Sequence, residues 1–466
     1  MHLLLSIDWK ILYAKDLFLS PLYLALIYLW AYYRKSATYK GTDIEKYFIP
    51  ALTVRMVGAV LTAFMYQYYY GYGDCFTYWL CSKYCWEHLF SSPDAYLNIL
   101  IKPFDSYSYN TLMMLDDLDH YKFFRDPSTN IVIRSSMFFS LFTFNTFLPV
   151  SFFITLFAFL GNWRFFLVFS SIYPKNKKYI AIAILFIPSV FFWGTGVMKD
   201  PICLGAMGFV IYYVHKLFIL KKISITSVVM IIFFTIIISM IKTYIVMSFI
   251  PACIFWVCYY NWFLIKSKFL KAIAIPFFLF SSIFGGILFI NNIGELGQKY
   301  STEAFLKTAQ TTQEWLTIAT KQVDGSSYSL GEIDYSYFGL LKVAPKAINV
   351  TLFRPYIWEA RKPILIPAAI ESLVFLSFIL YFVFKLGIIK FIRVIFSSPH
   401  ISFCFIFSMI FGFAVGFTSY NFGALSRYKL PCMPFFGLFI AIIYFQHIIP
   451  LKNKKDKNGI QREKRK

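Results

Sequence analysis

The sequence predicts an all-α, polytopic membrane protein with about eleven transmembrane helices and two large outer loops. Of the 466 residues, 59% are hydrophobic and 21% are aromatic. The mean hydropathy is +0.62. Apolar runs of about twenty residues, long enough to span a bilayer, recur along the chain. Water-soluble domains do not have this composition.

The positions of the basic residues predict how the chain is threaded. The formal net charge is +22. Because the cytoplasmic side of membrane proteins collects Lys and Arg, we place every basic cluster inside, and nearly all acidic residues then fall outside. This threading puts the amino terminus outside and the carboxyl terminus in the cytoplasm. The basic clusters are 34–40, 175–178, 216–222, 266–271, 385–393 and 452–466.

The basic charge therefore indicates topology. It does not indicate nucleic-acid binding, because no aromatic–basic motif of a nucleic-acid-binding fold accompanies it. We treat residues 1–451 as a single transmembrane domain that includes outer loops 71–133 and 291–362. Residues 452–466 are expected to form a basic cytoplasmic tail.

The predicted spans follow in order, interrupted by the two outer loops. Residues 134–146 are apolar but too short to cross, so we expect a re-entrant or interfacial helix there. The predicted spans are 17–33, 50–70, 147–171, 179–197, 201–218, 223–241, 244–265, 269–290, 363–384, 401–420 and 431–449.

Asp74 is the first carboxylate after the second predicted span. Gly71 and Gly73 are expected to break the helix before it, and the flanking aromatic residues are typical of the membrane–water interface. A carboxylate at this position suits a general base that acts on a membrane-bound substrate. The alternative is that Asp74 only caps the next helix.

Three further motifs fall on the outer face in this threading. They contain the cations Lys199, Arg354 and Arg427, each close to a glycine or proline. Arg offers a planar fork to two phosphate oxygens and Lys a point charge, so the motifs suit a lipid phosphate or diphosphate. Alternatively, the arginines only anchor helices in the interface. The neighbouring residues Asp200, Glu359 and Tyr428 belong to the same predicted site.

Two features inside and beside the membrane leave alternatives open. Glu371 lies within a predicted span, where an ionisable group indicates a functional site or a pairing with another helix, through Lys242 or Arg361. In the first outer loop, a disulfide among Cys75, Cys81 and Cys85 is left open.

The layout resembles the GT-C superfamily of integral-membrane glycosyltransferases. The resemblance rests on Gly73-Asp74 through Trp79, on the short helix after Arg134, and on the motifs around Lys199, Arg354 and Arg427. These motifs are also similar to bacterial membrane proteins of surface-polysaccharide clusters. The paired acidic motif of the family is missing directly after Asp74, and the pair Asp116-Asp117 is therefore the alternative base.

The resemblance implies an inverting glycosyltransferase in the bacterial inner membrane. Its donor would be a polyprenyl-phosphate-linked sugar and its acceptor a lipid-linked or other glycan, in cell-envelope polysaccharide or glycoconjugate assembly. Asp74 would act as the base, and the three cations would hold the lipid phosphate. No cofactor is certain, and a divalent metal ion is left open. The alternatives are a polysaccharide polymerase or ligase and a lipid-linked glycan transporter or flippase.

Overall fold

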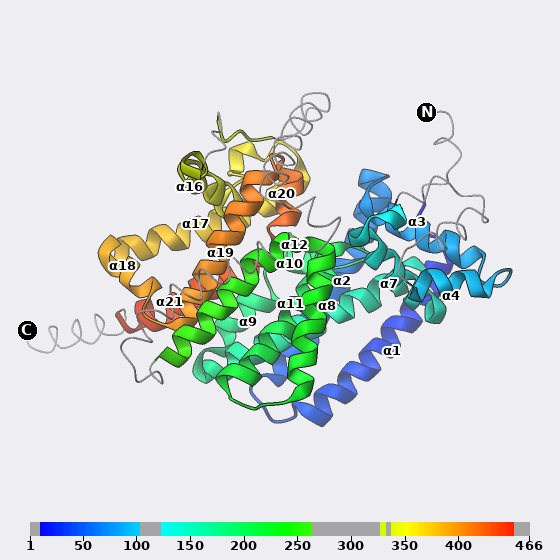
Figure 1. The fold of residues 1–466 in the computed structure, drawn as a ribbon, viewed down its shortest axis with the longest axis horizontal. Helices are drawn as coiled ribbons and strands as arrows, with labels where there is room; N and C mark the ends of the chain where they lie inside the picture. The colour runs from blue at the N-terminus through cyan, green and yellow to red at the C-terminus, as the bar shows by residue number, and fades with distance from the viewer. Residues whose placement is uncertain (1–9, 103–122, 263–326, 332–336, 452–466) are drawn as a thin grey trace, which may run out of the picture. The chain divides into compact units, whose positions relative to one another are not determined.

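The computed structural model describes residues 10–102, 123–262, 327–331 and 337–451. Within these ranges every regular element is a helix (Figure 1). Eight of the described helices are long and apolar enough to cross a bilayer, so the predicted all-α, multi-span membrane class is confirmed. The candidate spans are Ala14–Thr38, Glu45–Tyr70, Phe147–Ile172, Lys199–Ile219, Ile225–Asn261, Pro363–Leu386, Pro399–Thr418 and Leu430–Leu451.

The region predicted as a span at 179–197 forms two short helices, α9 (Lys177–Leu185) and α10 (Pro188–Trp193). The helix breaks before Pro188, because a proline disfavours helical backbone in the residue that precedes it. Neither helix alone has the length that a bilayer requires.

One helical run, α12 (Ile225–Asn261), covers most of the predicted spans 223–241 and 244–265. The backbone of α12 leaves helical geometry at Lys242, between the two predicted spans. The two parts of the run, 225–241 and 243–261, are each close to the length of a transmembrane helix. The predicted span 269–290 lies outside the described residues.

The chain forms two compact units. Unit 1 comprises Met1–Phe165, Phe191–Val210 and Met230–Thr243, and unit 2 comprises the remainder. The helices that lie mainly in unit 1 are α1 (Ala14–Thr38), α2 (Glu45–Phe64), the π-helix η2 (Met65–Tyr70), α3 (Asp74–Glu87), α4 (Pro93–Ile101), α7 (Pro127–Thr143), α8 (Phe147–Ile172) and α11 (Lys199–Val214).

Close packing in unit 1 depends on small residues. Gly161 of α8 faces Gly205 and Gly208 of α11, and a Cβ atom on Gly161 or Gly208 would overlap the backbone of the other helix. Small residues let helix backbones approach in this way within membranes. Helix α7 begins before the interfacial helix predicted at 134–146 and packs against α3 and α4 (Figure 1).

Unit 2 is built around α16, α19 and α21. Gly416 of α19 lies against the backbone of Ala347 in α16, and Thr351 donates a hydrogen bond to the Gly412 carbonyl at 2.6 Å. Helix α21 packs against α9 and α19. The described helices of unit 2 include α16 (Tyr337–Phe353), α17 (Ile366–Leu386), α18 (Ile388–Ile395), α19 (Pro399–Thr418), α20 (Phe422–Tyr428), α21 (Met433–Ile443) and the π-helices η4 (His215–Ile219) and η9 (Tyr444–Ile448).

Four short 3-10 helices complete the described elements: η3 (Pro174–Asn176), η6 (Ile357–Glu359), η7 (Pro363–Leu365) and η8 (Leu430–Cys432). Three of them contain proline in their first turn. Proline is tolerated there because the N–H groups of the first turn make no intrahelical hydrogen bond. Helices η7 and η8 directly precede α17 and α21 and so form the first turn of two candidate spans.

Candidate functional site

Asp74 is the first residue of α3. Gly71 ends η2 with a φ of 68°, and Gly73 is the N-cap of α3 with a φ of 123°. Side chains rarely adopt such φ values, which explains why glycine occupies both positions. The Asp74 side chain is exposed. It lies one residue inside the cap, where the helix dipole favours a carboxylate by about 0.3–1 kcal/mol.

Lys199 is the first residue of α11. A cation at this end of a helix is opposed by the helix dipole, so its position depends on other groups. The Nζ atom of Lys199 donates a hydrogen bond to Ser128 Oγ at 2.7 Å and lies 3.4 Å from Asp126 Oδ2. It also lies over the ring of Tyr78, 5.6 Å from the centroid. The charges of Asp74 and Lys199 are close enough to attract each other.

Asp126 is the N-cap of α7. Its Oδ2 atom accepts hydrogen bonds from the Thr129 amide at 3.1 Å, from Thr129 Oγ1 at 2.7 Å and from Ser128 Oγ at 2.6 Å. Asp126 was not among the predicted site residues. The signal was present, because an Asp followed by Pro at the first helical position marks a helix start. Asp126 thereby supplies a second carboxylate beside Lys199.

We call Asp74, Tyr78, Asp126, Ser128 and Lys199 the Asp74 cluster. Asp74 and Tyr78 lie one helical turn apart on α3, and side chains at this spacing share a helix face. The cluster is accessible, since 21% of the Lys199 side chain and 36% of the Asp126 side chain are exposed. It offers an exposed carboxylate, an ammonium group and an aromatic ring in one place.

Asp200 follows Lys199 but has a different environment. It is 1% exposed and forms an ion pair with Lys242, which is 7% exposed and lies at the break in α12. The Oδ2 atom of Asp200 has no hydrogen-bond partner within the described part of the chain. This ion pair is buried inside unit 1, and its two residues lie in candidate membrane spans.

Arg354, in unit 2, is held by Glu359. Its Nε donates a hydrogen bond to Glu359 Oε2 at 2.9 Å, and its Nη2 binds Oε1. The guanidinium also lies over the rings of Phe422 and Tyr328, 5.2 and 5.8 Å from their centroids. Burial alone would raise the pKa of the Glu359 carboxyl, but hydrogen bonds from Arg354 and from the Tyr356 amide hold the pKa below its usual value. The arginine fork is thus occupied by a carboxylate.

Lys429 and Glu371 form a buried charged group in unit 2. Lys429 is fully buried and donates to Ser372 Oγ at 3.0 Å. Glu371 accepts hydrogen bonds from the Ser189 amide and hydroxyl, at 2.9 and 2.7 Å. Burial lowers the pKa of Lys429, and the Glu371 carboxylate opposes this shift. Glu371 thus binds a neighbouring helix, one of the two alternatives left open, but through Ser189 of α10, and Lys242 pairs with Asp200 instead.

Arg427 and Tyr428 end α20 in unit 2. Arg427 is half-buried, and its cation lies in the last turn, where the helix dipole favours it. Tyr428 is exposed. We call Arg354, Glu359, Tyr328 and Phe422 the Arg354 cluster; Arg427 and Tyr428 lie further along the helix that begins with Phe422. Of the residues predicted to form one site, Asp74 and Lys199 lie close together in unit 1, whereas Asp200 is buried against Lys242. Arg354 and Glu359 pair in unit 2, which also contains Arg427 and Tyr428.

Two other expectations concern residues beside the clusters. Asp116 and Asp117 lie outside the described residues. The eight cysteines, all within the described ranges, are present as thiols, and Cys75, Cys81 and Cys85 are buried in α3. In the described part of the chain, no three His, Cys, Asp or Glu side chains are grouped to hold a metal ion.

Comparison of the chain with protein-family models, with curated proteins and with solved structures gave no match.

Proposed function

We propose that the protein is a GT-C-like, inverting glycosyltransferase that acts at the outer face of the membrane. Its donor is a polyprenyl-phosphate-linked sugar, and its acceptor is a lipid-linked or other glycan of the cell envelope. The observation that carries the proposal is the proximity of Asp74 and Lys199 in an accessible cluster. Such a reaction needs a proton acceptor for the incoming hydroxyl and a cation for the departing phosphate.

The proposed reaction is a single displacement. Asp74 accepts the proton of the acceptor hydroxyl as its oxygen attacks the anomeric carbon of the donor sugar. The bond between that carbon and the phosphate oxygen breaks, and its electron pair leaves with the polyprenyl phosphate. Lys199 stabilises the charge that develops on this oxygen. The Tyr78 ring lies under the Lys199 ammonium and helps to hold it in place.

Lys199 has partners that a phosphate could replace. Its ammonium is shared between Ser128 Oγ and Asp126 Oδ2, and the Asp126 contact is the longer, at 3.4 Å. A phosphate oxygen is a stronger acceptor than a hydroxyl, and charged hydrogen bonds are shorter than 3.4 Å when well formed. We therefore propose that the donor phosphate replaces Asp126 as the partner of the Lys199 ammonium.

In unit 2, Arg354 and Arg427 are proposed to bind the anionic part of a substrate. Arg354 becomes available only when Glu359 releases its guanidinium. Exchanging Arg354 for Lys keeps the charge and removes the fork, so binding that uses two phosphate oxygens should weaken. An interfacial anchor would tolerate this exchange.

The direct test uses the purified protein and synthetic polyprenyl-phosphate sugars with different sugar groups. Release of polyprenyl phosphate together with one added sugar on the acceptor supports the proposal. Transfer of a preassembled chain would instead indicate a polymerase or ligase. If no donor in such a panel releases its phosphate, while the protein carries its lipid in another assay, the proposed activity is wrong.

The proposal includes a threading with about eleven spans in the bacterial inner membrane, the carboxyl terminus being cytoplasmic. Cysteine substitutions at Tyr72 and Lys175, which are both exposed, test it in intact cells with an impermeant thiol reagent. Tyr72→Cys should be labelled and Lys175→Cys only after permeabilisation. The background is low, because seven native cysteines are buried and Cys258 is half-buried. The reverse pattern would contradict an active site on the outer face.

A lipid-linked glycan transporter is the second candidate, and the ion pair of Asp200 with Lys242 favours it. Ionisable residues within membrane spans often line transport pathways, and interrupted helices occur in transporters. Lys242 combines both features. Movement of a labelled lipid-linked sugar across a proteoliposome membrane, with the lipid chemically unchanged, would favour the transporter. If Asp200→Asn abolishes this movement and Asp74→Asn does not, the transport depends on the ion pair of Asp200 with Lys242.

A further inference from the structure

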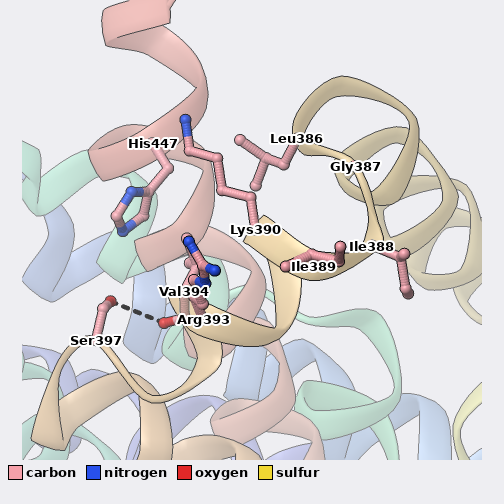
Figure 2. Close-up of a pocket in the computed structure, with 9 residues that line it drawn as sticks. All are labelled: Leu386, Gly387, Ile388, Ile389, Lys390, Arg393, Val394, Ser397 and His447. Carbon is pink, nitrogen blue, oxygen red and sulfur yellow. Dashed lines mark hydrogen bonds between the residues drawn. The ribbon is translucent and has the colours of Figure 1, made fainter.

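A basic pocket lies at the start of α18, in unit 2. Gly387 ends α17 with a φ of 77°, and the chain turns there into α18. The cavity has a volume of about 720 Å³, and its lining includes Lys390, Arg393 and His447 (Figure 2). It belongs to neither cluster described above.

The lining of this pocket is positively charged. Lys390 and Arg393 are three residues apart on α18, a spacing that places them on one face of the helix. The residues that line the pocket include no carboxylate. Within the described ranges, neither cation forms an ion pair. Lys390 also lies close enough to His447 for their charges to interact. Two cations without a carboxylate partner suit an anion with several oxygens.

Exposed apolar side chains lie beside the two cations on α18. Ile388 and Ile389 line the same pocket as Lys390 and Arg393 (Figure 2). Ile388 and Ile389 are 57% and 67% exposed, and Ile392 is 50% exposed. A helix that exposes basic and apolar side chains together is typical of the membrane–water interface. A soluble phosphate would need the cations alone, whereas a phospholipid also needs an apolar surface for its acyl chains.

We propose that this pocket binds the headgroup of an anionic phospholipid. The lipid phosphate accepts hydrogen bonds from Lys390 and Arg393, and the acyl chains lie along the exposed isoleucines of α18. Basic pockets beside transmembrane helices bind anionic headgroups in this manner. The proposal is independent of the glycosyltransferase activity, since it involves no residue of the Asp74 or Arg354 cluster.

Native mass spectrometry of the full-length protein tests the proposal. The protein is extracted from vesicles that contain phosphatidylglycerol and phosphatidylcholine in equal amounts, and the retained lipids are counted. We expect the wild type to retain phosphatidylglycerol preferentially. The double variant Lys390→Gln/Arg393→Gln should bind it at least about tenfold more weakly, because it loses charged hydrogen bonds. Lys390→Arg keeps the charge and should retain the lipid.

The control variant is Lys175→Gln/Lys178→Gln. It removes the same charge from exposed positions outside the pocket and should bind phosphatidylglycerol as the wild type does. Equal retention of phosphatidylcholine by the wild type, or an equal loss in this control, would overturn the proposal. The thermal stability of the detergent-solubilised protein gives a further test. If inorganic phosphate stabilises the protein against heating as much as phosphatidylglycerol does, the pocket binds soluble phosphate, and the proposal is overturned.

Discussion

The ammonium group of Lys199 lies over the ring of Tyr78, 5.6 Å from its centroid, and thereby joins the start of α11 to α3. A cation over an aromatic face gains about 0.5–1 kcal/mol at an exposed site and about 2 kcal/mol when desolvated. Since Asp74 precedes Tyr78 by one helical turn, this contact holds Lys199 beside the carboxylate. Lys199 is therefore positioned to stabilise the departing phosphate in the proposed reaction, and this role can be tested directly.

The first prediction concerns the charge of Lys199. Lys199→Gln should slow the release of polyprenyl phosphate by about 10²- to 10³-fold, because it removes a group that stabilises the departing oxygen. Release is measured from a labelled lipid donor. Lys83→Gln is the matched control: Lys83 lies on α3, is 29% exposed and pairs with Glu87. If the rate of release falls equally in both variants, the loss comes from removing any positive charge, and the role assigned to Lys199 is wrong.

Much of the fold follows from local signals in the sequence. The long apolar runs predict most of the candidate spans, and Gly71 and Gly73 predict the break before α3, because glycine accepts the positive φ found there. The charge pattern placed Asp74 and Lys199 on one face, and the structure brings them together. Each of these features depends on residues close together in sequence or on the distribution of charge along the chain, so the sequence alone indicates it.

The pairing of side chains could not be predicted in the same way. Asp200 is adjacent to Lys199 in sequence, yet it is buried and forms an ion pair with Lys242. Helix packing and the break in α12 determine which carboxylate faces which cation. Similarly, Asp126 reaches Lys199 across 73 positions of sequence. Hydrophobic periodicity carries no information on such long-range pairs.

The second prediction concerns the stability of the buried ion pair. Lys242→Met should destabilise the protein by about 3–5 kcal/mol, because it leaves the buried Asp200 carboxylate without its cation. The double variant Asp200→Leu/Lys242→Met removes both charges and should recover much of this loss. Unfolding in detergent micelles measures the change. Lys35→Met, which breaks the half-exposed pair with Glu45, should cost much less, because surface ion pairs contribute little to stability. Equal costs for the two single variants would contradict the burial argument.

The third prediction concerns pH and Glu359. Its pKa in the folded protein is held below the ordinary value of 4.5, so the carboxylate stabilises the folded state above that pH. This stabilisation should be lost as the pH falls through the lowered pKa. The midpoint of thermal unfolding should therefore fall less steeply below pH 4.5 in Glu359→Gln than in the wild type. Arg354→Gln, which removes the guanidinium, should flatten the profile as well. An unchanged slope in both variants would show that the pair does not stabilise the protein.

The last prediction concerns the base. Asp74→Asn should reduce glycan transfer by about 10²- to 10⁴-fold, the usual contribution of general base catalysis. Folding should be preserved, because Gly73 is the N-cap of α3 and the exposed Asp74 side chain fills no part of the core. Initial transfer rates and thermal unfolding of the same preparations give the two readouts.

Three further variants decide between Asp74 and the other carboxylates. Asp126→Asn retains the cap of α7, since Asn caps as well as Asp, and it removes the negative charge beside Lys199. It should therefore alter donor binding more than the transfer rate of the bound donor. Asp116→Asn and Asp117→Asn test the acidic pair further along the loop. If Asp74→Asn transfers sugar normally and one of these variants does not, the base is that other carboxylate, because an exposed group with no role in proton transfer leaves the rate unchanged.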